Sequence, residues 1–283
     1  MATSEALAIE RLARADIESG LRLSDAARWN QTADDWAFFI EHGEAFGIRA
    51  TSDDGLVATA AALPYGGSVG WIAMVLVDAG HRHRGLATRL VGACVDALHG
   101  GGRVPVLDAT PDGAAVYRRA GFVSGFAFER WQGEGAGAQH DGAELVAVAD
   151  ARQRDALLAL DRSLWDLDRS ALLRAFLARP ATRAWLTADA SGFAVLRAGR
   201  RAQQLGPVVA ANEEAAIGLV QQALGAASGP VFIDVPVHWP ALAAALPARG
   251  FVRQRPFVRM ALGAAQTTTA SGRAFAVAGP EFG

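Results

Sequence analysis

The residues best suited to bind an anion form one short motif, Arg82-His83-Arg84-Gly85-Leu86-Ala87. An apolar run, residues 71–77, precedes the motif, and an amphipathic stretch begins at Gly85. The first backbone N–H groups of a helix have no partner inside the helix and carry a partial positive charge. Small residues let an anion approach these groups, and arginine side chains can bind phosphate oxygens in pairs. The motif therefore predicts a phosphate-binding loop at the start of a helix.

The spacing of apolar residues indicates the elements that position this loop. Three-to-four periodicity predicts helices over 15–28, 33–40, 85–99 and 113–120. Apolar or alternating runs bounded by turn residues predict strands over 7–11, 46–50, 56–63, 69–77 and 104–109, and a strand pair over 122–131. Cys94 falls on the apolar face of the helix at 85–99, so we expect a core residue rather than a nucleophile that carries an acyl group.

The second half of the chain repeats the first. The matching segments, in chain order, are Val106-Leu107-Asp108 with Phe232-Ile233-Asp234, Ala120-Gly121-Phe122-Val123 with Arg249-Gly250-Phe251-Val252, Phe128 with Phe257, and Arg130 with Arg259. Matches in one order at similar offsets indicate duplication of a single α/β unit. We expect a first domain at 1–132 (the first copy), a linker at 133–143, a second domain at 144–263 (the second copy) and a C-terminal tail at 264–283.

The motif Arg82-x-x-Gly85-x-Ala87 resembles the Arg/Gln-x-x-Gly-x-Gly/Ala signature of the GNAT superfamily of N-acetyltransferases. Its setting is similar too, because a strand precedes it, a helix follows it, and Tyr117-x-x-x-Gly121-Phe122 comes later at the family's spacing. The resemblance covers residues 5–131. It implies an α/β (α+β) fold of two tandem GNAT-like acyltransferase units, each with a mixed, mostly antiparallel sheet flanked by helices.

In this family the loop holds the pyrophosphate of acetyl-coenzyme A, so the resemblance implies acetyl-CoA as cosubstrate. Main-chain groups of the preceding strand would bind the pantetheine arm, and an N–H near Val75 would polarise the acetyl carbonyl; a plain core strand is equally compatible with the sequence. The implied cofactor-binding residues are Val75, Leu76, Val77, Arg82, His83, Arg84, Gly85, Leu86, Ala87 and Thr88. No metal is expected, since the histidines show no ligand spacing.

The resemblance places Tyr117 at the family's general-acid position, where a phenol protonates the departing thiolate. A core tyrosine that anchors the short helix is the alternative. No general base is evident in the strand at 71–77. Asp108 and Glu129 are candidates, although a capping or surface role explains each equally well, and water could relay the proton instead.

Loops between the first two helices of each copy face the acceptor in this fold, which makes Trp29, Asn30 and Asp168 candidate substrate-binding residues. Core packing and helix capping explain them about equally well. The second copy lacks the signature, because Gly206-Pro207 follows its strand and no Arg-x-x-Gly-x-Ala comes after it. We therefore expect a degenerate second domain that does not bind acetyl-CoA in the usual way.

The sequence favours an acetyl-CoA-dependent N-acetyltransferase that transfers acetyl directly to a primary amine of a small molecule or peptide. A non-catalytic acyl-CoA-binding regulator is the alternative, and a module for another phosphate ligand is a third.

The 283 residues carry a net charge of −2, which argues against a nucleic-acid partner. No apolar run approaches the ~20 residues of a membrane span, and one cysteine without a signal peptide fits the cytoplasm. All 27 basic residues are arginine, typical of a GC-rich bacterial genome. The sequence leaves a homodimer open.

Overall fold

The computed structural model describes residues 7–50, 55–137, 145–164, 167–263 and 272–283. Contacts divide the chain into two compact units. Unit 1 comprises residues 1–64 and 70–105, and unit 2 comprises residues 65–69 and 106–283. The units follow contacts rather than chain order, so the last strand of the first copy belongs to unit 2.

The sheet of unit 1 consists of four antiparallel strands in the order β1-β2-β3-β5. They are β1 (Glu10–Arg11), β2 (Glu44–Arg49), β3 (Leu56–Leu63) and β5 (Val69–Val77). The strands predicted at 56–63 and 69–77 are confirmed, and the strand predicted at 7–11 is shorter. Every residue of β3 is buried, and four of its eight residues are alanine. Such small side chains let helices pack closely on both faces of a strand.

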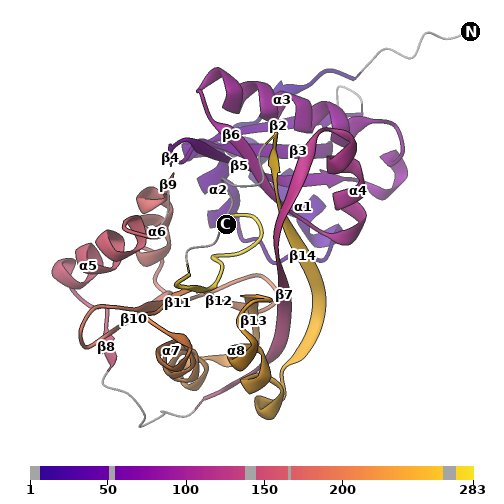
Figure 1. Cartoon of the computed structure of the whole chain (residues 1–283). Coiled ribbons are helices and arrows are strands. Elements are labelled where there is room, and N and C mark those ends of the chain that lie inside the picture. The colour runs from indigo at the N-terminus through magenta and orange to yellow at the C-terminus, as the bar shows by residue number, and fades with distance from the viewer. Residues whose placement is uncertain (1–6, 51–54, 138–144, 165–166, 264–271) are drawn as a thin grey trace, which may run out of the picture. The chain divides into compact units, whose positions relative to one another are not determined.

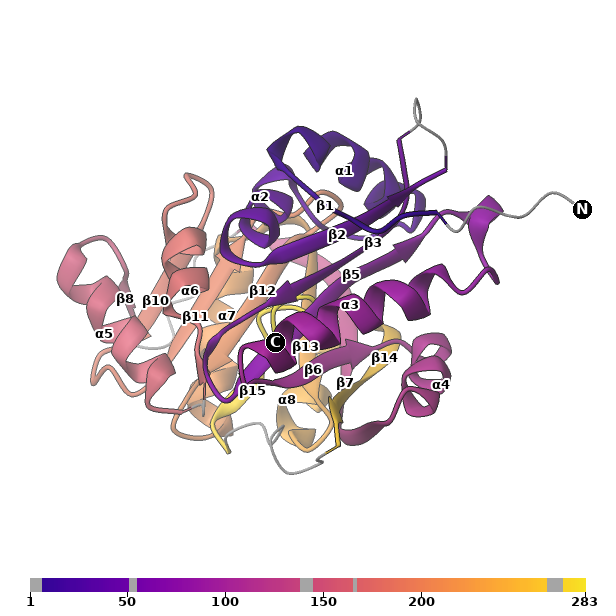
Figure 2. The ribbon, with the colours of Figure 1, turned by 90° about the horizontal axis from the view of Figure 1, so that it is seen from above.

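Helices cover both faces of this sheet, with α1 (Ile17–Ala26) and α2 (Ala33–His42) on one face and α3 (Leu86–Gly100) on the other (Figure 2). A 3-10 turn, η1 (Arg14–Asp16), leads into α1. Thr32 caps α2, because its side chain accepts from Asp35 N while the Asp35 carboxylate accepts from Thr32 N. Cys94 on α3 is fully buried, which confirms it as a core residue.

The larger sheet of unit 2 runs in the order β6-β14-β7-β13-β12-β11-β10-β8. Its strands are β6 (Val104–Ala109), β7 (Phe122–Ala136), β8 (Leu145–Ala147), β10 (Arg183–Thr187), β11 (Phe193–Arg197), β12 (Gln203–Val209), β13 (Ser228–Pro236) and β14 (Val252–Leu262). Only the β12–β13 pair is parallel among the ladders of this sheet described here. A separate two-stranded ladder joins β4 (Gly66–Gly67) to β9 (Leu167–Asp168).

The helices of unit 2 are α4 (Pro111–Arg119), α5 (Ala151–Arg162), α6 (Ser170–Leu177), α7 (Glu213–Ala226) and α8 (Pro240–Ala245), with a 3-10 turn η3 (Pro247–Arg249). The main apolar core lies between α7 and the strands around β12, and includes Leu205, Leu219 and Ile233. The helix predicted at 113–120 corresponds to α4. None of the helices in the described part of the chain has the length and apolar character that a membrane span requires.

The two copies exchange their last long strands. β7 of the first copy pairs with β13 of the second, and β14 of the second pairs with β6 of the first. β7 and β14 also run antiparallel side by side (Figure 1), and the rings of Phe128 and Phe257 stack between them with centroids 5.1 Å apart. The expected strand pair at 122–131 was therefore wrong, because β7 is a single strand of 15 residues with a partner on each edge. Residues 133–136 of the expected linker continue β7, and 138–143 lie outside the described residues.

The described end of the tail, residues 272–283, packs into unit 2. It includes a short strand, β15 (Ala274–Ala276), which pairs with β12. Residues 274–278 are each at most 1% exposed, and Phe282 is fully buried. This segment is part of the core of unit 2, a role that the sequence did not indicate.

Candidate active site

The strand that leads to the predicted loop contains a β-bulge. Thr59 on β3 lies opposite Leu76 and Ala61 lies opposite Ala73, so two residues of β5, Met74 and Val75, face one residue of β3. Met74 has a φ of 53°, which is rare for a residue with a side chain. The buried Thr59 hydroxyl donates to Met74 O over 2.9 Å and stabilises the bulge. Bulges take backbone groups out of a ladder and are frequent beside active sites.

The predicted pantetheine-binding residues lie at this bulge and just beyond it. Val75 and Val77 are half-buried, and Leu76 is buried at 5% exposure. Main-chain groups at such positions can bind a ligand while the apolar side chains pack in the core. The sequence placed Val75 at this point, but nothing in it indicated the left-handed conformation of Met74.

A tight turn connects β5 to α3. Asp78 Oδ1 accepts from Gly80 N over 3.0 Å and lies 3.0 Å from His81 Nδ1, within the 3-10 turn η2 (Ala79–His81). The hydrogen bond to His81, then that from Gly80, lowers the pKa of Asp78. Arg84 Nη2 donates to Gly80 O over 3.2 Å. These bonds fix the path of the loop before the helix begins.

The start of α3 is open and uncapped. Gly85 has a φ of 75°, and a Cβ built on it would meet no atom within 4 Å. No side chain caps the helix there, and no acidic residue lies in its first turn. Arg82, His83 and Arg84 are exposed. Uncapped N–H groups, an approachable glycine and exposed guanidinium groups are features that suit an anion, and the phosphate-binding role of the loop stays a prediction.

The remaining residues of this motif have different environments. The side chain of Leu86 is buried at 4% exposure and anchors the helix, so only its main chain is available to a ligand. Ala87 is half-buried and Thr88 is exposed. The ten cofactor-binding residues predicted from the sequence therefore form one stretch of unit 1, from the bulge to the first turn of α3.

Tyr117 lies on α4 of unit 2. Thr110 caps this helix by accepting from Gly113 N over 3.3 Å. The ring of Tyr117 is half-buried and packs against Phe122, with centroids 5.9 Å apart. A Cβ at Gly113 would lie 3.0 Å from Tyr117 Cε2, so glycine makes room for the ring. Packing thus fixes the phenol, and the general-acid role stays a prediction.

Asp108 is held in a buried ion pair. Its two carboxylate oxygens accept from Arg259 Nε and Nη2, both over 2.9 Å. Burial raises the pKa of Asp108, and Arg259 opposes that rise. Since both oxygens are engaged, this geometry gives no support to Asp108 as general base. The other candidate, Glu129, pairs with Arg253 over 3.0 Å near the surface.

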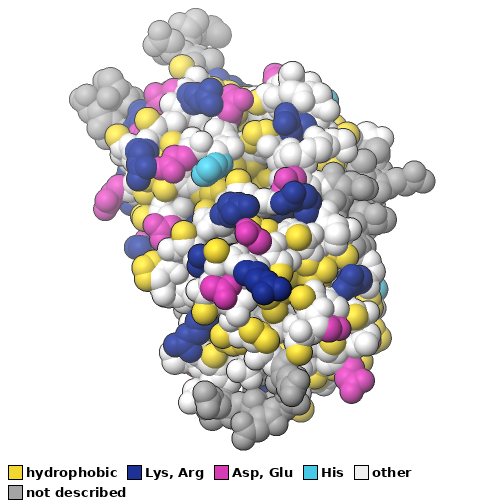
Figure 3. Space-filling model, turned by 90° about the vertical axis from the view of Figure 1, so that its left-hand side faces the viewer, with side chains coloured by type: hydrophobic (Ala, Val, Ile, Leu, Met, Phe, Trp, Pro, Cys, Tyr) yellow, Lys and Arg dark blue, Asp and Glu magenta, His cyan; other side chains and the backbone are white. Residues whose placement is uncertain are grey.

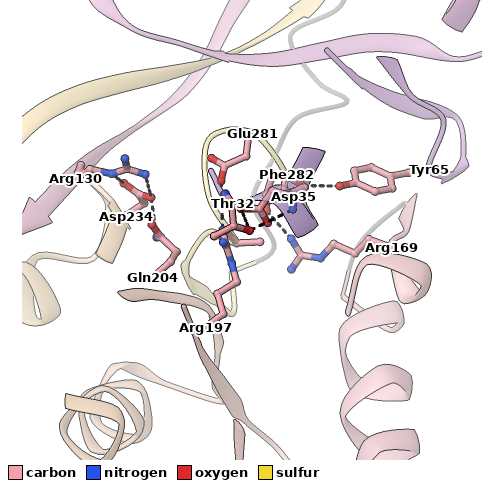
Figure 4. Close-up of polar contacts among 12 residues, drawn as sticks. Thr32, Asp35, Tyr65, Arg130, Arg169, Arg197, Gln204, Asp234, Glu281 and Phe282 are labelled. Atoms are coloured by element: carbon pink, nitrogen blue, oxygen red, sulfur yellow. Dashed lines mark hydrogen bonds and ion pairs between the residues drawn. The ribbon is translucent and has the colours of Figure 1, made fainter. Parts of the chain in front are cut away.

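An equivalent ion pair joins Asp234 of the second copy to Arg130 of the first. Arg130 Nε and Nη2 donate to the two oxygens of Asp234 over 2.8 and 2.7 Å, and Gln204 Nε2 donates to Asp234 over 3.0 Å (Figure 4). Burial by itself would lower the pKa of Arg130, but Asp234 raises it. Each aspartate thus binds the arginine of the other copy's exchanged strand. The sequence matched these four residues as repeats without indicating that they pair across the copies.

The predicted acceptor-binding residues lie in separate units. In unit 1, Trp29 is half-buried, and its main-chain N–H donates to Ser24 O over 2.9 Å. Asn30 is 4% exposed. The neighbouring Gln31 is also 4% exposed, and its Oε1 has no hydrogen-bond partner among the residues described. In unit 2, Asp168 precedes Arg169, the N-cap residue of α6, and its carboxylate accepts from Ser170 N over 2.8 Å. This local hydrogen bond gives Asp168 a structural role at the start of the helix, and its acceptor role stays a prediction.

The charged surface offers no single basic patch on the face in Figure 3, where basic and acidic side chains alternate. Within the described ranges, no three His, Cys, Asp or Glu side chains gather into a possible metal site.

Family comparisons agree with the two-copy organisation. Residues 10–122 match the model of the Acetyltransferase (GNAT) family, and residues 157–276 match that of an Acetyltransferase (GNAT) domain. The chain therefore belongs to the GNAT acetyltransferases and carries two GNAT domains in tandem. It is 25% identical over 239 residues to the uncharacterized N-acetyltransferase YitH of Bacillus subtilis, covering 82% of this chain and 83% of that protein.

Solved structures show the same fold. A putative acetyltransferase from Pyrococcus horikoshii aligns with a TM-score of 0.81 at 18% identity, over 100% of this chain and 98% of that one. A tandem GNAT protein from the clavulanic acid biosynthesis pathway aligns with a TM-score of 0.64 at 16% identity, over 90% of this chain and 98% of that one. The expected tandem fold, with largely antiparallel sheets flanked by helices, is confirmed.

Proposed function

We propose that the chain is an acetyl-CoA-dependent N-acetyltransferase and that its acetyl-CoA site lies in the first copy. The observation that carries this proposal is the uninterrupted series of β5 bulge, tight turn and uncapped α3. The N–H groups at the start of α3 bind the pyrophosphate, with Arg82 and Arg84 adding positive charge. Main-chain groups of Val75 and Val77 bind the pantetheine arm.

The acetyl group passes directly from sulfur to nitrogen. The acceptor nitrogen bonds to the thioester carbonyl carbon, the carbon–sulfur bond breaks, and Tyr117 donates its proton to the departing thiolate. An N–H freed at the bulge stabilises negative charge on the carbonyl oxygen. Cys94 takes no part, because it is buried inside unit 1 and burial raises the pKa of its thiol. The amine loses its proton to water, since Asp108 is already paired.

The acceptor we propose is a primary amine of a small molecule or peptide. A non-catalytic acyl-CoA-binding regulator is the second candidate. One observation favours it, which is that both predicted base candidates, Asp108 and Glu129, are engaged with arginines.

Two measurements on the full-length protein test the proposal. Calorimetry is expected to show acetyl-CoA binding, and a panel of amines assayed for thiol release is expected to show turnover with at least one acceptor. Binding without turnover on any amine class favours the regulator. The absence of binding by acetyl-CoA, with or without an amine present, overturns both candidates.

A further inference from the structure

The C-terminal segment, residues 273–283, lies where two parallel strands of unit 2 part. The β12–β13 ladder pairs Gln203 with Val231 and extends to Leu205 and Ile233. Further along β12, Val208 and Val209 pair with β15 instead. The opposite edge of β12 is occupied by β11 at the same residues, so β15 takes the edge that β13 has left. Val277 N donates to Asp234 O on β13 over 3.1 Å, which joins the segment to both strands.

β12 is the counterpart in the second copy of β5, the strand whose main chain we propose to bind pantetheine. After β12 the chain has no phosphate-binding motif, and its helix α7 begins with Glu213 and Glu214. The main-chain groups that a cofactor arm would need on β12 are hydrogen-bonded to residues 274–276. In the second copy, therefore, an extended peptide occupies the strand edge that corresponds to the proposed cofactor edge.

Residues of unit 2 fit closely around this segment. A Cβ at Gly206 would lie 2.1 Å from Val277 O, so only glycine permits the observed approach. Trp239 Nε1 donates to Ala274 O over 2.7 Å, and its ring lies 4.1 Å from that of Phe275. Trp239 therefore contacts the main chain of the segment through its hydrogen bond and an aromatic side chain through its ring.

Buried polar side chains hold the other end of the segment. Arg197, which is 1% exposed, donates to Ala278 O over 3.0 Å and lies 3.3 Å from Glu281. Arg169 Nη1 donates to Gly283 O over 2.6 Å, and the Tyr65 hydroxyl donates to Phe282 O over 2.9 Å (Figure 4). Burying two guanidinium groups is costly unless partners are present, and the segment supplies several of these partners.

We propose that the second copy contains a peptide-binding cleft whose occupant is the chain's own C-terminal segment. The cleft takes an extended peptide with an aromatic residue at the first end and an acidic and an aromatic residue at the other. This proposal rests on the proposed function only where it names pantetheine as the ligand that the segment displaces. The contacts of the segment do not depend on that function. The full chain accordingly binds one acetyl-CoA rather than two.

The cleft is tested with a full-length protein that carries a protease site within residues 264–271. After cleavage, the segment is expected to co-elute with the rest of the chain on gel filtration. A fluorescent peptide of residues 272–283 is expected to exchange into the nicked protein, and the same peptide with Phe275 and Phe282 changed to alanine is expected to exchange at least tenfold more weakly. Loss of the segment on gel filtration without a fall in melting temperature, or equal binding of both peptides, overturns the proposal.

A point variant gives a second test without cleavage. Gly206→Ala introduces the Cβ that meets Val277 O, and we expect hydrogen exchange at residues 274–277 to accelerate at least tenfold. Gly229→Ala is the matched control, because Gly229 also has a positive φ but has nothing within 4 Å of a Cβ. Equal exchange in both variants contradicts the proposal. Calorimetry with acetyl-CoA on the same proteins separates the peptide-binding cleft from the proposed function. If acetyl-CoA does not bind, the proposed function is overturned, but the hydrogen-exchange result at residues 274–277 still tests the cleft.

Discussion

The two copies differ most sharply at the helix that follows the strands β5 and β12. In the first copy, α3 begins at an open glycine, without a side-chain cap and without acidic residues in its first turn. In the second copy, Asn212 caps α7 by accepting from Ala215 N over 2.9 Å, and Glu213 and Glu214 occupy the first turn. A capped helix start with two carboxylates repels an anion. A few residues thus distinguish the proposed phosphate site of the first copy from the same position in the second.

The strands β5 and β12 both carry a bulge, because Met74 and Val75 face one residue of β3, and Gly206 and Pro207 face one residue of β11. They differ in the residue at the start of the bulge, since Gly206 admits the C-terminal segment where β5 has Met74. Meanwhile the buried pairs Asp108–Arg259 and Asp234–Arg130 are alike in both copies. The copies thus share their buried ion pairs and differ in the loop before the helix and at one strand edge.

The largest expected effect comes from breaking what the copies share. Asp234→Ala leaves Arg130 buried without its carboxylate, so we expect the free energy of unfolding to fall by about 3–5 kcal/mol. Asp108→Ala is expected to cost about as much, because Arg259 is left in the same position. Urea denaturation of both variants measures these losses. A loss below about 1 kcal/mol in one variant but not in the other means that the two pairs are not equivalent.

Next in size is the loss of the proposed anion site in the first copy. Gly85→Val places a branched side chain over the start of α3, and we expect acetyl-CoA to stop stabilising the protein against heat. At a hundredfold excess over Kd, the stabilisation lost is about 2.7 kcal/mol. Gly250→Val is the matched control, because Gly250 has a φ of 77° and equally open space. Retained stabilisation in Gly85→Val contradicts the loop assignment.

The role of Tyr117 is tested by removing its hydroxyl alone. Tyr117→Phe keeps the packing on Phe122, so we expect kcat to fall by about 10²-fold, the low end for general acid catalysis, with little change in acetyl-CoA affinity. Steady-state kinetics with calorimetry separate these quantities. Equal losses in kcat and affinity indicate a structural role for the ring instead.

The smallest change makes the first copy resemble the second. Ala87→Glu puts a carboxylate into the first turn of α3, as Glu213 and Glu214 do in α7. We expect acetyl-CoA affinity to fall while the unliganded protein gains about 0.3–1 kcal/mol of stability from the helix dipole. Ala87→Gln, which matches the size without the charge, controls for bulk. If both variants bind acetyl-CoA equally well, charge at this helix start does not distinguish the copies.

Local patterns in the sequence predicted much of the first copy. The strands at 56–63, 69–77 and 104–109 have the predicted bounds, because unbroken apolar runs between turn residues favour only one structure. The Arg82 motif and the periodic apolar residues after it predicted a loop that leads into a helix, and α3 begins at Leu86. The bulge at Met74 was not predictable, because it results from the offset between β3 and β5 and leaves no mark on residue type.

The sequence by itself determined that one α/β unit occurs twice and that only the first copy keeps the predicted phosphate-binding motif. Repeats and motifs consist of residue types at fixed spacing along the chain, so they can be recognised without the fold. Only the tertiary structure decided which copy's strand lies beside which, since β7 and β14 carry the same repeated phenylalanine and arginine and either could have stayed with its own copy. It also decided that Phe275 and Phe282 of the tail bury themselves beside β12 and α6. Those contacts join residues far apart in the chain, and no local pattern specifies a distant partner.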